Sequence, residues 1–338
     1  MDVTGNSELP PFTAARWARG GHLQTIFGYY LPGPNTLPAA KTLHIPVSGG
    51  DVLLADENIP AAPGASKLVV LFHGLGGHSE SPYMLRIATR FYDQGWRVIR
   101  VNHRGAGKGA GKARQLYHSG RSEDIDTVLR FAAEHAPDVP MVVVGFSLSG
   151  NMLLKYLGDG QATLPETLAG AIAVSPPVDL ALCARAISKR SNLIYDQRFV
   201  RMLRASLQER RQAFADFTHP ALPEKLSLRE FDEYITAPLC GFADAADYYA
   251  RCSANQFLEH ITTPTTLIAA DDDPFIPVET YTPLPKTRFL DIHITRSGGH
   301  VGFVNRTQTP LGDRRWLDYA LLQRAQHYLA QVQEPEYQ

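Results

Sequence analysis

The segment VVVGFSLSGN, residues 142–151, holds two serines two positions apart, and a serine can act as the nucleophile of acyl transfer. It follows a β-branched run and precedes a helical pattern, which is the context of a nucleophile elbow. Such an elbow needs small residues two positions before and after the nucleophile. Gly145 and Ser149 satisfy this around Ser147, whereas a nucleophile at Ser149 would be flanked by the larger Asn151. The pattern favours Ser147, although the motif alone fits an ordinary strand-to-helix loop equally well.

A serine nucleophile also needs a histidine base and a carboxylate that orients the base. Behind this type of elbow the expected chain order is serine, acid, histidine. Asp271, Asp272 and Asp273 follow the apolar run TTLIAA, and His300 lies between glycines after the next strand pattern. Asp179, after the run GAIAVS, is an alternative acid. All these residues follow strands, where the sites of parallel sheets gather.

An oxyanion hole is the fourth part that acyl transfer requires. The stretch HGLGG begins at His73, directly after the apolar run KLVVLF, so its backbone N–H groups can face the nucleophile. We expect the oxyanion to be bound by the N–H groups of Leu75 and Leu148. His73 and Gly74, together with Gly145 before the nucleophile, are expected to support this arrangement.

We expect no metal and no cofactor. His73 and His78 lack a second cluster of ligands at the spacing of zinc sites. The glycine-rich residues 105–112 look like a phosphate loop, but Ala106 and Ala113 stand where that motif needs glycine and Ser or Thr. A flexible basic loop is the simpler interpretation.

Strand-like runs alternate with helical patterns over most of the chain. This predicts an α/β fold with a mostly parallel central sheet and helices on both faces. The expected strands are two that flank Ser48–Gly50 as a hairpin and residues 67–72, 96–102, 141–146, 170–175, 265–270 and 290–294. The expected helices are residues 82–94, 122–135, one after Ser147, and a closing helix with Leu317, Leu321, Ala325 and Tyr328 on one face.

Between residues 178 and 260 the alternation stops, and the sequence reads as helices and loops. We predict a helical cap inserted into a single domain that spans residues 1–338. Residues 1–40 are expected to form an irregular segment that packs on the core. In the cap, Tyr248, Tyr249 and Phe242 fit either an acyl pocket or ordinary packing.

The cap also carries a basic amphipathic pattern, with two open interpretations. It comprises Arg198, Arg201, Arg204 and Arg210 against Phe199, Leu203 and Leu207. Such a helix could bring the protein to a lipid surface, or it could be a solvated face over the core of the cap. The pattern is therefore compatible with peripheral membrane contact but does not require it.

The composition indicates an ordinary globular protein. Apolar residues make up 44% of the 338 residues, and the formal net charge of -1 gives no attraction to nucleic acid. Three cysteines without CxxC spacing favour a reducing compartment. The N-terminus has no signal-peptide pattern, and the apolar runs are too short to span a bilayer. We expect a cytoplasmic protein of undetermined oligomeric state.

Several longer stretches resemble the YheT-like branch of the α/β-hydrolase superfamily, which is related to yeast medium-chain fatty acid ethyl ester synthases/esterases. They are GGHLQT (21–26), HGLGGHSESPY (73–83), NHRGAG (102–107), YHSGRSEDI (117–125), GFSLSGNMLLKYLG (145–158), EFDEYITAPLCGFADAADYY (230–249), DDPF (272–275) and GGHVGF (298–303). The resemblance implies that Ser147, Asp273 and His300 form the catalytic triad. At Ser149 the sequence departs from the family's usual glycine, and we expect glycine to be tolerated there.

Together these features predict a serine esterase. It would cleave short- to medium-chain acyl esters through an acyl-enzyme, and its partner would be a small, in some cases lipid-like, ester. Acyl transfer, thioester or amide cleavage on the same triad, and a non-catalytic ligand-binding protein of the same fold, are the alternatives.

Overall fold

The computed structural model describes residues 9–61 and 66–333, and eight strands in these residues form one sheet in the order β1-β2-β4-β3-β5-β6-β7-β8. The strands are β1 (Lys41–Pro46), β2 (Val52–Asn58), β3 (Leu68–Phe72), β4 (Arg97–Val101), β5 (Met141–Phe146), β6 (Leu168–Val174), β7 (Thr265–Ala270) and β8 (Leu290–Thr295). Strand β2 runs antiparallel to β1 and β4, and the remaining pairs are parallel. The predicted hairpin and mostly parallel sheet are therefore confirmed.

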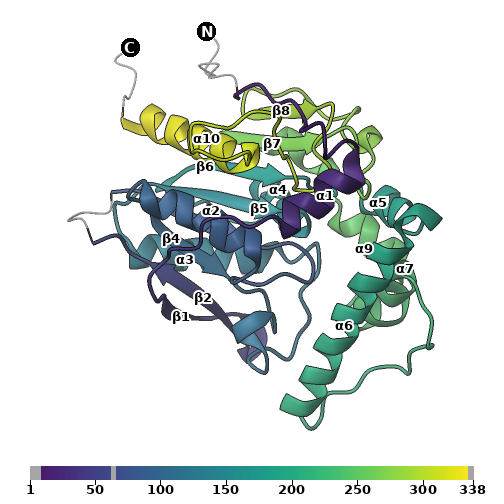
Figure 1. Ribbon diagram of the computed structural model, residues 1–338. Coiled ribbons are helices and arrows are strands. Elements are labelled where there is room, and N and C mark those ends of the chain that lie inside the picture. The colour runs from purple at the N-terminus through teal and green to yellow at the C-terminus, as the bar shows by residue number, and fades with distance from the viewer. Residues whose placement is uncertain (1–8, 62–65, 334–338) are drawn as a thin grey trace.

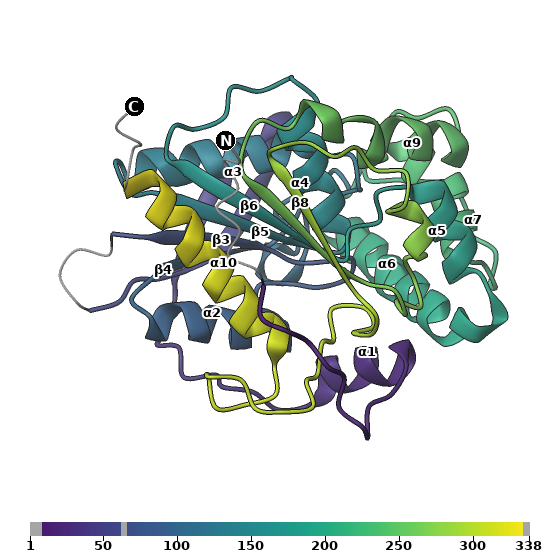
Figure 2. The same cartoon turned by 90° about the horizontal axis from the view of Figure 1, so that it is seen from above.

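Strands β3, β5 and β6 are made of apolar residues and glycine because both faces of the sheet are covered. Every residue of β3, β5 and β7 is buried, whereas β8, at the edge, is only partly buried. Helices α2 (Pro82–Asp93) and α10 (Trp316–Gln333) cover one face (Figure 2). Helices α3 (Ser122–His135) and α4 (Leu148–Gly158) cover the other. Each face has its own apolar core, and the predicted face of the closing helix is buried.

Between β6 and β7 the described chain forms helices and loops with no strand. The helices are α5 (Leu180–Ile187), α6 (Leu193–Ala213), α7 (Leu228–Phe231), α8 (Ala237–Leu239) and α9 (Ala245–Cys252), with a π-helical turn over Asp232–Thr236. They gather at one end of the sheet, and α6 is the longest of them (Figure 1). We call this group of helices the cap.

The prediction that residues 1–40 are irregular is wrong in part, because helix α1 (Gly21–Tyr30) lies within them. The helix packs closely on the loops after β7 and β8: a Cβ atom at Gly21 would collide with the carbonyl oxygen of Asp272 after β7, and one at Gly28 with Gly302 in the loop after β8. The side chain of Gln24 bonds the backbone of that loop. Tertiary contacts rather than an amphipathic pattern thus stabilise α1. Residues 1–8 of the predicted segment lie outside the described residues.

Candidate active site

Ser147 lies at the sharp turn between β5 and α4. Its backbone adopts φ 53° and ψ -118°, which is unusual for a residue other than glycine. The Ser147 amide donates to the carbonyl of Val174 at 2.8 Å, which holds the turn against the next strand. A Cβ atom at Gly145 would lie 2.5 Å from the carbonyl oxygen of Ser149. Glycine at position 145 therefore permits the close approach of strand and helix that the motif predicts.

The structure brings Ser147, His300 and Asp273 into one hydrogen-bonded chain. The distance from Ser147 Oγ to His300 Nε2 is 2.8 Å, and from His300 Nδ1 to Asp273 Oδ2 it is also 2.8 Å. With Nδ1–H donating to the carboxylate, Nε2 is free to accept the serine proton. The other carboxylate oxygen of Asp273 accepts the amides of Phe275 and Ile276 at 2.8 and 3.1 Å, which fixes its orientation.

Of the four aspartates considered as the acid, Asp273 is the one that contacts His300. Asp271 is exposed. Asp272 accepts the amide of Gly299 at 2.8 Å and so stabilises the histidine loop, and burial raises the pKa of its carboxyl. Asp179 caps α5 by accepting the Leu182 amide at 2.9 Å. The geometry thus gives Asp272 and Asp179 structural roles and leaves Asp273 as the one aspartate of the four in contact with His300.

Helix α1 supports His300, and the sequence analysis did not foresee this contact. The His300 amide donates to Thr25 Oγ1 at 2.8 Å across 275 positions of the chain. Gly299 before it has φ 57°, and a Cβ atom there would collide with the carbonyl oxygen of Gly21. The GGHLQT stretch, which was noted only as part of a resemblance, was the available signal.

In the loop after β3, the backbone amides on both sides of Leu75 donate hydrogen bonds to tyrosine hydroxyls. The Gly74 amide donates to the hydroxyl of Tyr83 at 2.9 Å, and the Gly76 amide to that of Tyr117 at 3.0 Å. Neither tyrosine was predicted to take part. In residues 9–61 and 66–333, the amides of Leu75 and Leu148 have no hydrogen-bond acceptor. Unpaired amides beside a nucleophile are what an oxyanion hole requires.

Ser149 does more than leave room for the helix. Its buried hydroxyl donates to the carbonyl of His73 and lies 2.6 Å from His103 Nε2. The His103 amide in turn donates to His73 Nε2 at 3.2 Å. Burial lowers the pKa of both histidines, that of His103 to about 4, so both are neutral near pH 7. His73 is therefore part of a buried network behind the loop, and no described group of three His, Cys, Asp or Glu residues is placed to hold a metal ion.

Two cavities meet at Ser147 and His300. The first, of about 350 Å³, we call the outer cavity. It lies between α1, the loop after β3 and α6, and its lining includes Ile26, Tyr29, Tyr30, Arg198, Met202 and Val301. The second, of about 110 Å³, we call the cap cavity. Its lining includes Leu180, Ile187, Phe199, Asp232, Tyr249 and Phe275.

Of the three cap aromatics expected either to line an acyl pocket or to serve ordinary packing, two line a cavity and one does not. Tyr248 and Tyr249 line the cap cavity. Phe242 instead packs on Tyr248, with ring centroids 5.1 Å apart, and on His118. Cap packing thus accounts for Phe242, whereas the two tyrosines are placed to meet a ligand.

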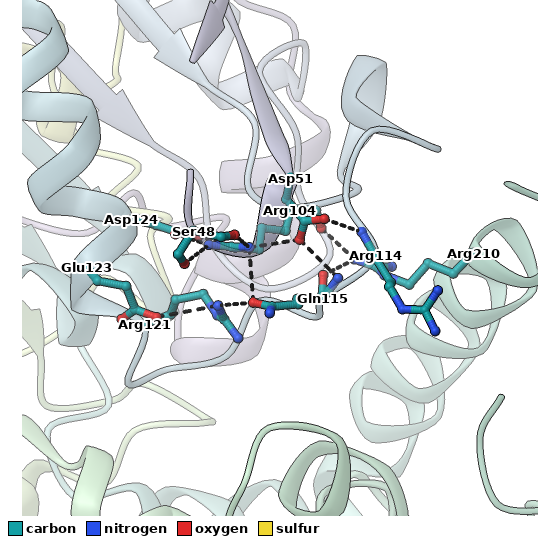
Figure 3. Close-up of polar contacts among 9 residues, drawn as sticks. All are labelled: Ser48, Asp51, Arg104, Arg114, Gln115, Arg121, Glu123, Asp124 and Arg210. Carbon is teal, nitrogen blue, oxygen red and sulfur yellow. Dashed lines mark hydrogen bonds and ion pairs between the residues drawn. The ribbon is translucent and has the colours of Figure 1, made fainter. Parts of the chain in front are cut away.

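The arginines of the basic pattern on α6 do not all face solvent. Arg201 is exposed, but Arg210 is buried and donates to the backbone carbonyls of Arg104 and Gln115 at 2.7 and 3.2 Å. Figure 3 shows Arg210 reaching from α6 toward the buried Arg104.

None of the helices in the described part of the chain has the length and apolar character needed to cross a bilayer.

Comparison with known proteins places these features in context. The family model described as alpha/beta hydrolase fold matches residues 67–306. The protein named "Putative esterase YheT" of Escherichia coli (strain K12) is 32% identical over 94% of this chain and 93% of its own length. The "Medium-chain fatty acid ethyl ester synthase/esterase 2" of Saccharomyces cerevisiae is 29% identical, covering 71% of this chain and 58% of its own. The structure of the Pyrococcus furiosus esterase Pf2001 aligns with a TM-score of 0.52 at 14% identity, over 89% of this chain and 97% of that one.

Proposed function

This chain belongs to the alpha/beta hydrolase fold family, and we propose that it is an esterase that cleaves carboxylic esters through an acyl-enzyme formed on Ser147. The observation that carries the proposal is the chain of two 2.8 Å hydrogen bonds from Ser147 through His300 to Asp273. The two amides without an acceptor, those of Leu75 and Leu148, lie beside this chain on residues that line the cap cavity with Ser147.

In the acylation step, Ser147 Oγ attacks the carbonyl carbon of the ester while its proton passes to His300 Nε2. Asp273 stabilises the imidazolium that forms. The carbonyl oxygen becomes an oxyanion that accepts hydrogen bonds from the amides of Leu75 and Leu148. When the intermediate collapses, the bond to the alcohol oxygen breaks, and the departing alcohol takes the proton from His300.

In the deacylation step, water donates its proton to His300 and attacks the acyl carbon, so that the acid is released and Ser147 regains its proton. An alcohol in place of water would give acyl transfer by the same steps. The apolar linings of the two cavities favour short- to medium-chain, lipid-like esters, in keeping with the name of the medium-chain fatty acid ethyl ester synthase/esterase of yeast. We place this activity in the cytoplasm, as the cysteine usage suggests.

A fluorophosphonate probe together with nitrophenyl esters tests the proposal. We expect the probe to label the wild-type protein and to leave Ser147→Ala unlabelled, with ester turnover reduced to the residual rate that binding and the oxyanion hole support. Asp273→Asn should lower kcat by about 10⁴-fold, since the histidine is then held in the wrong tautomer. Matched thioesters and amides identify the bond that is cleaved fastest.

Asp179→Asn is the matched control, because this carboxylate caps α5 and does not contact His300. It should retain ester turnover. Absence of both labelling and turnover in the folded wild-type protein would refute the esterase proposal. Loss of turnover in Asp179→Asn with retention in Asp273→Asn would show that the acid is misassigned.

A further inference from the structure

Asp232 places a carboxylate in the wall of the otherwise mainly apolar cap cavity. It stands at the start of the π-helical turn Asp232–Thr236, and it lines the same cavity as Ser147. Its side chain is only partly covered by the protein. π-Helical turns often occur at functional sites, because they redirect side chains out of the regular helical positions. The position of Asp232 therefore calls for a chemical explanation beyond packing.

The hydrogen-bonding capacity of this carboxylate is only half used. One oxygen accepts the hydroxyl of Thr236 at 2.7 Å, and the other accepts the hydroxyl of Tyr249 at 2.8 Å. A carboxylate offers about four acceptor sites. No arginine, lysine or histidine of the described residues forms an ion pair with Asp232. Burial raises its pKa to about 6, against the lowering effect of the two hydroxyls, so the group is ionised above that pH.

His118 adds a donor to the same cavity. Its Nδ1 accepts the amide of Gly120 at 3.2 Å, so in the neutral ring the proton resides on Nε2. For this proton the described residues provide no acceptor. Burial and then the nearby arginines, first among them Arg121, lower the pKa of His118 to about 3, so the ring is neutral. The same positive surroundings oppose a cationic ligand, whereas a neutral hydroxyl can both donate and accept.

The size of the cavity limits what can reach this end. A volume of about 110 Å³ is somewhat smaller than a cavity of roughly 150 Å³ that holds one benzene molecule. A chain of about four or five non-hydrogen atoms is therefore the largest that fits without movement of the cap. The outer cavity is three times larger and is left for the alcohol part of the ester.

We propose that the cap cavity binds a short acyl chain that carries a hydroxyl group, and that this hydroxyl donates a hydrogen bond to Asp232. The inference rests on the proposed function, because it assigns the acyl part of the substrate of the same site. Asp232 is then a specificity-determining residue, and the preferred substrates are esters of short hydroxy acids rather than of simple fatty acids.

Matched pairs of nitrophenyl esters test this directly. The pairs are butanoate with each enantiomer of 3-hydroxybutanoate, and pentanoate with each enantiomer of 3-hydroxypentanoate. In the wild-type protein we expect at least one hydroxylated ester to have a kcat/KM about ten- to a hundred-fold above that of its partner, as a hydrogen bond to a charged group allows. In Asp232→Asn this ratio should fall to near one.

Asp196→Asn is the matched control, since Asp196 is a buried carboxylate of the cap that accepts the Leu228 amide at 2.8 Å and lines neither cavity. Its ratio should equal that of the wild type. The kcat/KM ratios of the wild-type protein test the preference for hydroxylated esters without any variant, so the test holds even if Asp232→Asn does not fold. Turnover with every ratio at or below one would overturn this inference and leave the esterase proposal standing, whereas absence of labelling and of all turnover would refute the esterase proposal itself.

Discussion

At the scale of single residues, Ser149 shows how a departure from a motif can be stabilised by its surroundings. Its hydroxyl connects the carbonyl of His73, at the start of the loop that carries Leu75, with the buried ring of His103. Both histidines are neutral because burial lowers their pKa. The serine therefore satisfies polar groups that a glycine in the same place would leave unpaired.

Replacing Ser149 with glycine should lower stability more than activity. The variant leaves the His103 Nε2–H and the His73 carbonyl without this partner, which costs about 1–3 kcal/mol in the free energy of unfolding. Glycine inside a helix adds up to about 1 kcal/mol. The nucleophile is unchanged, so fluorophosphonate labelling of Ser147 should persist. Urea unfolding measures the loss of stability. Ser149→Ala isolates the contribution of the hydroxyl, because alanine keeps the helix propensity. A Ser149→Ala variant as stable as the wild type would contradict the stabilising role of this hydroxyl.

At the scale of elements, a buried charge network joins the cap to the sheet (Figure 3). The guanidinium of Arg104 lies 2.8 Å from Asp51, before β2, and 2.6 Å from Asp124, in the first turn of α3. The backbone carbonyl of the same arginine accepts Arg210 from α6. Because Arg104 follows β4, three parts of the core and one helix of the cap meet at this point, which positions α6 over the two cavities.

Arg210→Met tests this connection. The variant removes the hydrogen bonds to the carbonyls of Arg104 and Gln115 but keeps most of the apolar stem. We expect the free energy of unfolding to fall by about 1–3 kcal/mol and the amides of α6 to exchange hydrogen faster. Arg201→Met, an exposed position on the same helix, should change stability by no more than about 0.5 kcal/mol. Equal exchange in both variants would show that Arg210 does not anchor the cap.

At the scale of the whole molecule, several histidines are buried in the neutral form between the sheet and the elements above it. Burial lowers the pKa of His73 well below its usual value, that of His103 to about 4 and that of His118 to about 3. In the unfolded chain each has a pKa of about 6.5. Below that pH the unfolded state binds more protons, so stability is full above pH 6.5 and declines as the pH falls toward 4. Burial also raises the pKa of the carboxyls of Asp196, Asp272 and Asp232, that of Asp232 to about 6, and these groups act in the opposite direction. Burial lowers the pKa of His293 and His327 as well, and these two act in the same direction as the three buried histidines.

Urea unfolding at pH 7.5 and at pH 5.0 measures this effect. Each buried histidine contributes up to about 1.4 kcal/mol per pH unit below 6.5, so we expect a clear loss of stability at the lower pH. His118→Gln should reduce the difference between the two pH values, whereas His260→Gln, at an exposed position, should leave it unchanged. A His118→Gln variant with the full pH dependence would contradict the assignment.

Much of the fold could be predicted from the sequence because it depends on local patterns. Fully apolar runs mark strands that are buried on both faces, and the limits of α3 agree with the acids and the serine at its start. The positions of Ser147, Asp273 and His300 followed from the same patterns, since Ser147 comes directly after β5 and the other two lie in the loops that follow β7 and β8. Their catalytic roles stay a prediction until the labelling experiment is done.

What only the tertiary structure decided involves partners far apart in the chain. Helix α1 carries no amphipathic pattern, because its stability comes from contacts with residues about 250 to 280 positions away. The tyrosines that bond the loop after β3, the burial of Arg210 and the cavity wall at Asp232 likewise depend on how separate elements meet. Periodicity reports which face of an element is buried, but not what lies against it. The second serine of VVVGFSLSGN, predicted to be a small spacer, therefore acquired its hydrogen-bonding partners only in the folded protein.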